Sequence, residues 1–507
     1  MAVACASLPA LLLRSVEERP DAVAIVDGNR RVSYAALWGQ VSAVAGFLAE
    51  LEIGKGDRVA LFLENSADYV AAYYAILLSG GVVVALNTAT KARDIDAWVR
   101  HSDARLLIAD ANHPEYAAIL ERVDAALPIV ALGLNAVSDR NRYTWSQAAA
   151  TPPAPQHPGG LPEEGLAAII YTSGTTGNPK GVTLTHGNLS SNTLSILRYL
   201  ELRPDDSIVN VLPFFYSYGN SILHTHLAAG GRIVLEKSML YPAQVLNRMA
   251  EERVTGFSGV PSTYSILLNR VNLAQYDLSS LRYMTQAGGP MAPADVQRLT
   301  SLLPNVRFFV MYGQTEASAR LAYLPPEKLF EKLGSIGIAI PGVRIEIRGP
   351  DDQELAPNVA GELCAHGRNI MHGYWKDPET TRKVLRDAWL HTGDVAYRDD
   401  DGYLYIVGRA TDMIKSGAHR ISPKEIEEVV LELDGVAETV AVGVPDPMLG
   451  QAIKLIVVPK PGSALDSRAI QRHCRDNLAN YKIPKLIEFS ESLPRTPSGK
   501  VQRFKLQ

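Results

Sequence analysis

The feature that most constrains the fold is a regular alternation of short apolar runs with longer amphipathic patterns over the first 320 residues. The apolar runs have the length of β-strands and lie at residues 59–63, 106–109, 167–171, 208–212 and 307–310. Strands that alternate with helices form parallel sheets whose two faces are both covered by helices. We therefore predict an α/β fold with a large N-terminal domain of helix-flanked, mostly parallel sheets.

The second half of the chain has a different pattern. From about residue 334 to residue 408, short strand-like segments are separated by turn-forming residues, which predicts a β-rich subdomain. After residue 408, predicted helices at 423–433 and 467–477 are interleaved with strands at 436–442, 453–458 and 487–489. This order is typical of a small, compact α+β unit at the C-terminal end.

Length and charge exclude several classes of protein. The 507 residues suffice for about three folding units, and 50 Lys and Arg against 54 Asp and Glu give a net charge of −4. No segment is rich enough in Lys and Arg to indicate nucleic-acid binding. The three cysteines, Cys5, Cys364 and Cys474, are widely spaced, which disfavours a disulfide framework or a structural zinc site.

We expect no membrane span and a cytoplasmic location. The N-terminal segment lacks a basic stretch before its short apolar run, so it does not resemble a signal peptide. Residues 69–90 carry no charge, but Ser79, Gly80 and Gly81 interrupt them. The segment therefore predicts a helix, a turn and a buried strand instead of a transmembrane helix.

The segment AAIIYTSGTTGNPKG at residues 167–181 contains the clearest functional motif. A predicted buried strand leads into a loop of glycines and hydroxyl residues that ends with Lys180. Glycines allow backbone N–H groups to turn toward an anion, hydroxyls add donors, and lysine adds a positive charge. Pro179 and Gly181 stand where a Walker A loop requires other residues. The loop thus predicts a polyphosphate site of another kind.

This loop resembles the phosphate-loop signature of the adenylate-forming superfamily, which includes acyl- and aryl-CoA synthetases, adenylation domains of peptide synthetases, and luciferases. Further motifs follow in the order of that family. They are QAGGP at 286–290, MYGQTEA at 311–317, GIAIPG at 337–342, GEL at 361–363, GYW at 373–375, HTGD at 391–394, YIVGR at 405–409, IKSG at 414–417, ISPKE at 421–425 and PRTPSGK at 494–500.

The resemblance implies a reaction in two steps. A carboxylate attacks the α-phosphate of ATP to give acyl-AMP and pyrophosphate, and a thiol then displaces AMP. By this resemblance Glu316 holds Mg²⁺ and Thr315 lies near the α-phosphate, and Asp394 with Arg409 binds the ribose, while Tyr312 flanks the adenine. The implied ATP- and AMP-binding residues are Thr172, Ser173, Gly174, Thr175, Thr176, Gly177, Lys180, Gly288, Gly289, Tyr312, Gly313, Thr315, Asp394 and Arg409.

The family pattern also assigns Lys500 as a catalytic lysine, with Thr315 and Glu316. A catalytic lysine on a separate terminal unit implies that this unit moves during the reaction. We expect an N-terminal domain at 1–408, a hinge at 409–411 with Thr411 as its pivot, and a C-terminal domain at 412–507. The implied thiol tunnel includes Ser416, Gly417 and Ala418, where Ala418 replaces a frequent glycine.

The predicted acyl pocket mixes aromatic and small polar residues, which suits an aryl acid or a short-to-medium acyl acid with a hydrogen-bonding group. No acidic residue lies between Pro213 and Gly231 to pair with a substrate ammonium, so an α-amino acid is disfavoured. His224 and His226 are two residues apart on a predicted helix, which argues against a joint metal site. The expected lining residues are Tyr216, Ser217, Tyr218, Asn220, Ser221, Phe257, Ser258 and Gly259.

The leading hypothesis is an acid–thiol ligase that acts as a monomer or homodimer, with ATP, Mg²⁺ and coenzyme A. A stand-alone adenylation enzyme that loads the phosphopantetheine of a carrier protein is the alternative, and the sequence does not choose between the two acceptors. A luciferase-like oxygenase and a non-catalytic homologue are weaker hypotheses. The hypothesis of a non-catalytic homologue is disfavoured because a scaffold needs no dispersed nucleotide ligands, and the chain contains Lys180, Glu316, Asp394, Arg409 and Lys500.

Overall fold

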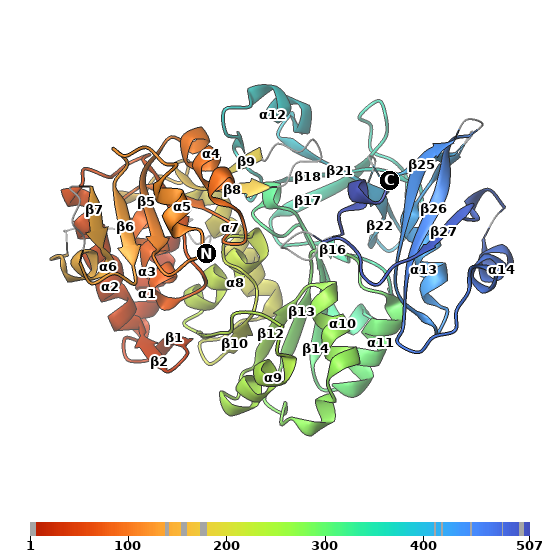
Figure 1. The fold of residues 1–507 in the computed structure, drawn as a ribbon, viewed down its shortest axis with the longest axis horizontal. Coiled ribbons are helices and arrows are strands. Elements are labelled where there is room, and N and C mark those ends of the chain that lie inside the picture. Colours follow the sequence, from red (N-terminus) through yellow and green to blue (C-terminus); the bar gives the residue numbers. More distant parts are fainter. Residues whose placement is uncertain are drawn as a thin grey trace.

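The computed structural model in Figure 1 describes residues 7–136, 141–153, 160–172, 180–409, 412–416, 419–446, 449–478, 480–495 and 501–507. Two large sheets form the N-terminal part of the molecule. A smaller sheet follows, and the C-terminal part, blue in Figure 1, is built on a fourth sheet at one side.

The first large sheet has nine strands in the order β16-β15-β14-β13-β12-β10-β11-β1-β2. Its central strands, from β14 to β1, are parallel, and the strands at both edges are antiparallel. The strands are β16 Ile338–Ala339, β15 Ala322–Leu324, β14 Arg307–Tyr312, β13 Tyr283–Gln286, β12 Gly256–Gly259, β10 Ser207–Asn210, β11 Arg232–Leu235, β1 Val23–Asp27 and β2 Arg30–Ser33.

The second large sheet has eight strands in the order β19-β9-β8-β4-β3-β5-β6-β7. Strands β8, β9 and β19 pair antiparallel, and the others pair parallel. The strands are β19 Gly373–Tyr374, β9 Lys180–Thr185, β8 Leu166–Thr172, β4 Val82–Ala85, β3 Arg58–Phe62, β5 Ala104–Asp110, β6 Ile129–Leu132 and β7 Arg142–Thr144.

The strands of the eight-stranded sheet are apolar on both faces because helices cover both. In β3, Val59 and Leu61 belong to the core between the two large sheets, whereas Ala60 and Phe62 pack in a second core with α4 Ala92–Ser102 and α5 Tyr116–Leu120. Successive side chains of a strand point to opposite faces, so an unbroken apolar run fills two cores at once. The predicted mostly parallel α/β architecture is confirmed.

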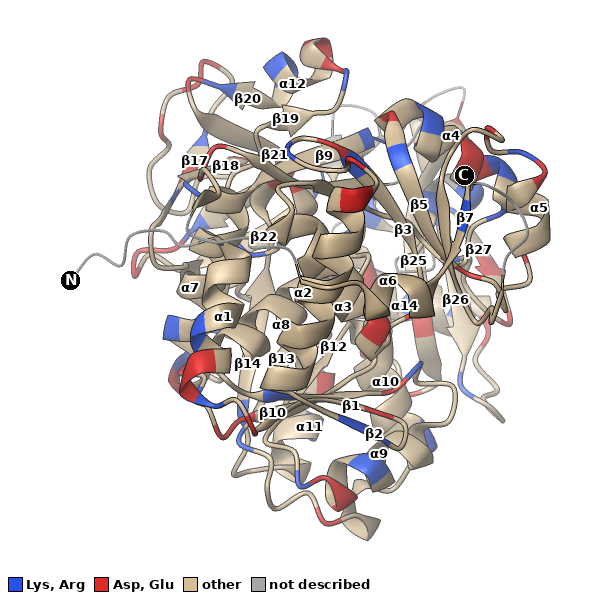
Figure 2. Ribbon diagram, turned by 90° about the vertical axis from the view of Figure 1, so that its left-hand side faces the viewer, with Lys and Arg blue, Asp and Glu red and all other residues tan. Residues whose placement is uncertain are grey.

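Helices α1, α3 and α8 lie in the layer between the two large sheets, as Figure 2 shows. Helix α8 carries no charged residue, in keeping with this buried position. The helices of this N-terminal part are α1 Leu8–Glu18, α2 Tyr34–Glu50, α3 Ala67–Leu78, α4, α5, α6 Trp145–Ala150, α7 His186–Leu200, α8 Ser217–Ala228, α9 Pro242–Glu251, α10 Pro261–Arg270 and α11 Pro293–Leu302, with the short 3₁₀ turns η2 Leu273–Gln275, η3 Thr315–Ala317 and η4 Pro326–Lys328.

Two smaller sheets complete the fold. The third sheet has the order β17-β18-β21-β20, with β22 paired to β21, and the fourth has the order β24-β23-β26-β25, with β27 paired to β26. Their elements are β17 Val343–Arg348, β18 Gly361–Gly367, α12 Pro378–Val384, β20 Leu385–Arg386, β21 Trp389–Arg398, β22 Leu404–Arg409, β23 Ile414–Ser416, β24 His419–Ile421, α13 Pro423–Leu431, β25 Val436–Asp446, β26 Gly450–Pro459, α14 Ser467–Asn477, η5 Asn480–Lys482, β27 Leu486–Phe489 and η6 Arg503–Lys505.

The structure refines one sequence-based expectation and confirms another. The strand predicted at 208–212 ends at Asn210, because the buried Asn210 side chain hydrogen bonds with the backbone of Leu212 and turns the chain. The uncharged segment 69–90 forms the rest of α3, a turn and β4. Within the described residues, no helix is long and apolar enough to cross a membrane.

Candidate active site

One part of the predicted site lies at the carboxyl edge of the nine-stranded sheet. The parallel strands β12, β13 and β14 end there side by side, at Gly259, Gln286 and Tyr312. The glycines predicted at the nucleotide follow β13, and Thr315 and Glu316 follow β14. In open α/β sheets, ligands bind beyond the carboxyl ends of the strands, so the position suits a substrate site.

The third sheet contributes the predicted ribose residues. Asp394 on β21 is directly opposite Arg409 on β22, and Arg409 Nε donates to Asp394 Oδ1 at 3.0 Å. Tyr312 of the nine-stranded sheet donates its hydroxyl to Asp394 Oδ2 at 2.5 Å. Burial, and then the charge of Asp394, raise the pKa of Tyr312 well above its ordinary value, so the hydroxyl stays protonated and remains a donor.

A hydrogen-bonded group of side chains supports the strand that carries Asp394. His391 Nδ1 donates to Glu362 Oε2 at 2.9 Å, and the other oxygen of Glu362 accepts from the Gly393 backbone at 3.1 Å. Cys364 Sγ lies 3.4 Å from the same His391 nitrogen. Glu362, Cys364 and His391 have the residue types of a metal site. Burial raises the pKa of the Cys364 thiol to about 12, however, which favours a neutral thiol with a structural role.

The eight-stranded sheet brings Lys180 to Glu316. Lys180 begins β9, and its Nζ lies 5.3 Å from the centre of the Tyr374 ring on the neighbouring strand β19. The Tyr374 hydroxyl donates to Glu316 Oε1 at 2.8 Å. The backbone oxygen of Glu316 also accepts from the Met371 N–H at 2.8 Å. The cation Lys180, the ring of Tyr374 and the carboxylate of Glu316 therefore come together from three distant parts of the sequence. The sequence analysis recognised the GYW motif but assigned no role to Tyr374.

Thr315 contacts the first residue of α8. Its hydroxyl donates to Ser217 Oγ at 3.2 Å, which joins a predicted catalytic residue to a predicted acyl-pocket residue. The preceding Gly313 is required by packing, because a Cβ atom there would lie 2.0 Å from the backbone oxygen of Ala319. The chain thus folds back closely after β14 and holds the 3₁₀ turn of Thr315 and Glu316 in place.

The two glycines that follow β13 are beside α10. Gly288 has a φ of +87°, which disfavours any residue with a side chain, and a Cβ atom would lie 3.2 Å from Val260. Gly289 accepts a 2.6 Å hydrogen bond from the Gln286 amide through its backbone oxygen. The conformation of this turn therefore depends on glycine at 288.

The residues predicted for the acyl pocket separate into three groups. Asn220 accepts from the Tyr73 hydroxyl at 3.2 Å, and Phe257 is fully buried against Tyr264, so both belong to the core. Tyr216, whose hydroxyl accepts from Asn87 at 3.2 Å, comes immediately before α8. Ser217 lies at Thr315, and Gly259 ends β12.

The other three predicted residues, Tyr218, Ser221 and Ser258, line a small cavity of about 10 Å³ beside α8. A volume of about this size holds no more than one water molecule, so in this conformation the cavity is too small for an acid. Thr285 and Arg320 also line it, although the sequence analysis missed both. Arg320 belongs to no sequence motif, so only the structure identifies it as a lining residue.

His224 and His226 are buried on α8 and do not form a metal site with each other. Burial lowers the pKa of His224 to about 3 and that of His226 to about 4. The His224 ring nitrogen lies 3.1 Å from the Tyr73 hydroxyl, and His226 accepts from the Tyr283 hydroxyl at 2.6 Å. Both imidazoles are thus neutral groups of the core, as the sequence favoured.

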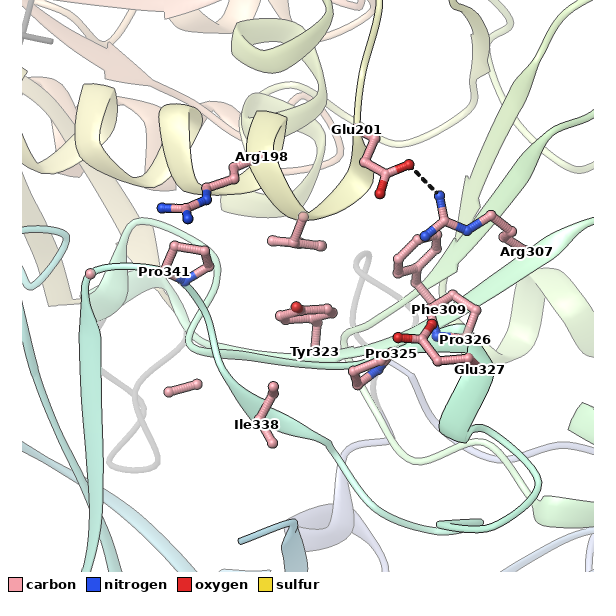
Figure 3. A pocket seen from close by; sticks show the side chains of 13 residues that line it. Arg198, Glu201, Arg307, Phe309, Tyr323, Pro325, Pro326, Glu327, Ile338 and Pro341 are labelled. Atoms are coloured by element: carbon pink, nitrogen blue, oxygen red, sulfur yellow. Dashed lines mark hydrogen bonds and ion pairs between the residues drawn. The ribbon is translucent and has the colours of Figure 1, made fainter. Parts of the chain in front are cut away.

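A larger hollow of about 530 Å³ opens between the end of α7 and strands β14 to β16 (Figure 3). Tyr323 stacks on Tyr199 there at a centroid distance of 4.3 Å, and Arg307 pairs with Glu201 at 2.9 Å. Arg307 begins β14, at the opposite end from Tyr312. No predicted site residue lines this hollow, so it is distinct from the candidate active site.

Several predicted residues lie outside the described part of the chain. Thr172 ends β8 and is paired with Lys180, which brackets the predicted phosphate loop. Ser416 is a buried residue of β23. The predicted residues that the structure does not describe are Ser173, Gly174, Thr175, Thr176 and Gly177 of the loop, Thr411 of the hinge, Gly417 and Ala418 of the tunnel, and Lys500.

Comparisons with known proteins identify the family of the chain. The model of the AMP-binding enzyme family matches residues 12–375, and the model of the AMP-binding enzyme C-terminal domain matches residues 425–500. Feruloyl-CoA synthase of Amycolatopsis sp is 36% identical over 491 residues, which cover 96% of each chain.

Solved structures agree along almost the whole chain. The anthranilate CoA ligase AuaEII in complex with anthranoyl-AMP is 25% identical with a TM-score of 0.89 and covers 99% of this chain and 96% of its own. ATP-bound MatB from Rhodopseudomonas palustris is 29% identical with a TM-score of 0.88. The match covers 99% of this chain and 98% of the MatB chain.

The chain therefore belongs to the AMP-binding enzyme family, within the adenylate-forming superfamily. It is an enzyme of the AMP-forming acid–thiol ligase class, as the motifs predicted, and ATP and AMP are the nucleotides of this family.

Proposed function

We propose that the chain activates a carboxylic acid with ATP to give acyl-AMP and pyrophosphate, and then transfers the acyl group to coenzyme A. The observation that carries this proposal is the convergence of Lys180, Thr315, Glu316, Asp394 and Arg409 from three sheets at one edge. They are dispersed over 230 residues of sequence, and their types match the parts of a nucleoside triphosphate.

The attack of a carboxylate on a polyphosphate brings negative charges together, so the site must supply cations and oriented donors. Lys180 supplies a positive charge at the end of the 173–179 loop, next to the phosphates. The Thr315 hydroxyl binds near the α-phosphate, and the carboxylate of the acid lies beside it, at the start of α8. Asp394 accepts hydrogen bonds from the ribose hydroxyls, and Arg409 holds the aspartate in orientation.

Glu316 fits the role of magnesium ligand. One of its oxygens accepts from Tyr374, which fixes the carboxylate, and carboxylate oxygens are the ligands that Mg²⁺ prefers. When bound, the ion offsets charge on the phosphates. Lys180 Nζ lies over the ring of the same tyrosine, 5.3 Å from its centre, so Tyr374 contacts both the cation and the metal ligand.

Two parts of the proposal rest on the resemblance to the family. Lys500 reaches the α-phosphate during adenylation, and the C-terminal domain, residues 412–507, then rotates about the hinge at 409–411, with Thr411 as pivot. The pantetheine thiol approaches past Ser416, Gly417 and Ala418. Coenzyme A is the favoured acceptor because feruloyl-CoA synthase and the anthranilate CoA ligase are named for it. A carrier protein is the alternative acceptor.

The test is a product assay with purified enzyme, ATP and Mg²⁺ across a panel of aryl and short-to-medium acyl acids. We expect pyrophosphate release with some acids and, when coenzyme A is added, a thioester detected by mass spectrometry. Pyrophosphate release without any coenzyme A thioester, but with acylation of an added phosphopantetheinyl carrier protein, would favour the alternative acceptor. No release with any acid would contradict the proposal.

A further inference from the structure

Arg320 is a buried cation whose partners are all neutral. It follows η3, and the residue is 3% exposed. Its guanidinium carbon lies 4.1 Å from the centre of the Tyr218 ring, Nη1 donates to the Ala319 backbone oxygen at 3.2 Å, and Nε lies 3.4 Å from Met311 Sδ. It also hydrogen bonds with the Tyr199 hydroxyl. No carboxylate within the described part of the chain comes within 4.0 Å of it.

Other shielded arginines of this protein have carboxylate partners. Arg348, whose side chain is 13% exposed, pairs with Glu346 at 2.9 Å, and Arg282, at 23%, pairs with Asp206 at 2.5 Å. Removing a guanidinium from water costs several kcal/mol, as an order of magnitude, unless a counter-charge is supplied. Arg320 is more buried than either, yet the described residues supply only ring, sulfur, hydroxyl and carbonyl contacts.

Arg320 lines the small cavity beside α8, together with Tyr218, Ser258 and Thr285. The hydroxyls of these three residues are already bonded to one another, with Tyr218 to Thr285 at 2.8 Å and Ser258 to Thr285 at 2.7 Å. The remaining titratable base in the lining is His226, whose pKa is lowered by burial to about 4, so it is neutral. Arg320 thus supplies the positive charge among the described lining residues.

The cavity lies near the place proposed for the reacting carboxylate of the acid. Thr315 contacts Ser217 at the start of α8, and the next residue, Tyr218, carries the ring against which Arg320 packs. An acid whose reacting carboxylate lies at Thr315 is thus next to the start of α8, and Arg320 packs on the second residue of that helix.

We propose that Arg320 is a specificity-determining residue that selects acids carrying a second carboxylate at the end remote from the activated one. The inference rests on the proposed function and names the substrate class of that same site. A carboxylate and a guanidinium form two parallel hydrogen bonds in a desolvated pocket, a geometry that a neutral group cannot match. Binding of such an acid replaces the cation–π contact with Tyr218 by a charged pair.

The experiment compares each of four dicarboxylic acids, succinate, glutarate, isophthalate and terephthalate, with its own monomethyl ester in the pyrophosphate-release assay. We expect at least one dicarboxylate to have a kcat/KM about tenfold or more above that of its half-ester. In Arg320→Met that preference is lost, because the dicarboxylate falls and the half-ester does not. Arg320→Lys retains an intermediate preference. The control variant Arg307→Met, in the larger hollow of Figure 3, leaves the preference for the dicarboxylate unchanged.

A binding measurement keeps the inference separate from the proposed function. Non-reactive acyl-sulfamoyl adenosines, each with a free terminal carboxylate or its methyl ester, are titrated calorimetrically into wild type and Arg320→Met. Tighter binding of the free carboxylate in wild type alone supports the inference, even if no acid releases pyrophosphate. Equal losses for both ligands in Arg320→Met, at an unchanged melting temperature, would overturn it, as would a wild type that shows no preference. If Arg320→Met does not fold, Arg320→Lys decides: a weaker preference for the free carboxylate than in wild type supports the inference, and an unchanged preference overturns it.

Discussion

Replacing Tyr312 with Phe is the most specific perturbation of the predicted ribose site. The change removes one oxygen atom and keeps the ring in the core. The Tyr312 hydroxyl donates to Asp394 Oδ2 at 2.5 Å, and the Asp394 side chain is only 8% exposed, so water does not readily replace the lost donor. Arg409 still holds Oδ1 at 3.0 Å. In the Tyr312→Phe enzyme, Oδ1 of Asp394 therefore remains fixed by Arg409, whereas Oδ2 has lost its donor.

The magnitude follows from the kind of bond. A hydrogen bond to a charged group contributes about 1.5–3 kcal/mol, and each 1.36 kcal/mol corresponds to about a factor of ten. If the freed oxygen is the one that receives a ribose hydroxyl, KM for ATP rises by about tenfold to a hundredfold while KM for the acid changes little.

The assay is steady-state pyrophosphate release with ATP varied at saturating acid, and the melting temperature is measured alongside. Tyr405→Phe is the matched control, because the Tyr405 hydroxyl contacts Asp399 at 3.4 Å in the same sheet and away from the site. An unchanged or lower KM for ATP in a well-folded Tyr312→Phe enzyme would refute the reasoning. A lower value would mean that the tyrosine competes with the ribose.

Three further predictions concern the metal ligand, the buried histidines and the terminal lysine. Glu316→Gln lowers kcat/KM by about a hundredfold or more and raises the Mg²⁺ concentration needed for half-maximal rate, whereas Glu327→Gln in the outer hollow does neither; an unaltered Mg²⁺ titration would exclude Glu316 as a ligand. Burial lowers the pKa of His224 to about 3 and of His226 to about 4 from an ordinary value of 6.5, so the unfolded chain binds more protons below pH 6.5. The free energy of unfolding in urea falls by up to about 1.4 kcal/mol per pH unit per histidine from pH 6.5 toward 4, and a flat profile would contradict the neutral, buried state. Lys500→Ala abolishes acyl-AMP formation but retains thioester formation from supplied acyl-AMP, and equal loss of both half-reactions would argue against its assignment to adenylation.

The sheets were predictable because the alternation of apolar residues encodes burial on both faces. In β3, Val59 and Ala60 pack in different cores, and only a strand covered on two sides needs apolar residues at both positions. The end of β10 was less predictable. Asn210 stops the strand through its own side chain, and the apolar pattern of the next residues gives no sign of that.

The site was predictable only where a residue belongs to a motif with an assigned role. Glu316 and Asp394 were found through the family resemblance, but their supports were not. Tyr374 reaches Glu316 because β19 pairs with β9 of the eight-stranded sheet, a contact between segments almost 200 residues apart. Arg320 was missed for the same reason, since its partner Tyr218 is distant in sequence and nothing next to Arg320 marks it as buried.

The central claim is that the edge where three sheets meet binds ATP and joins an acid to AMP. Exchange of labelled pyrophosphate into ATP tests this claim most directly, because it reports reversible acyl-AMP formation without any thiol. We predict exchange that requires both Mg²⁺ and a suitable acid and that is lost in Glu316→Gln. Exchange that stays at background with every acid in the panel, in an enzyme with an unaltered melting temperature, would contradict the account.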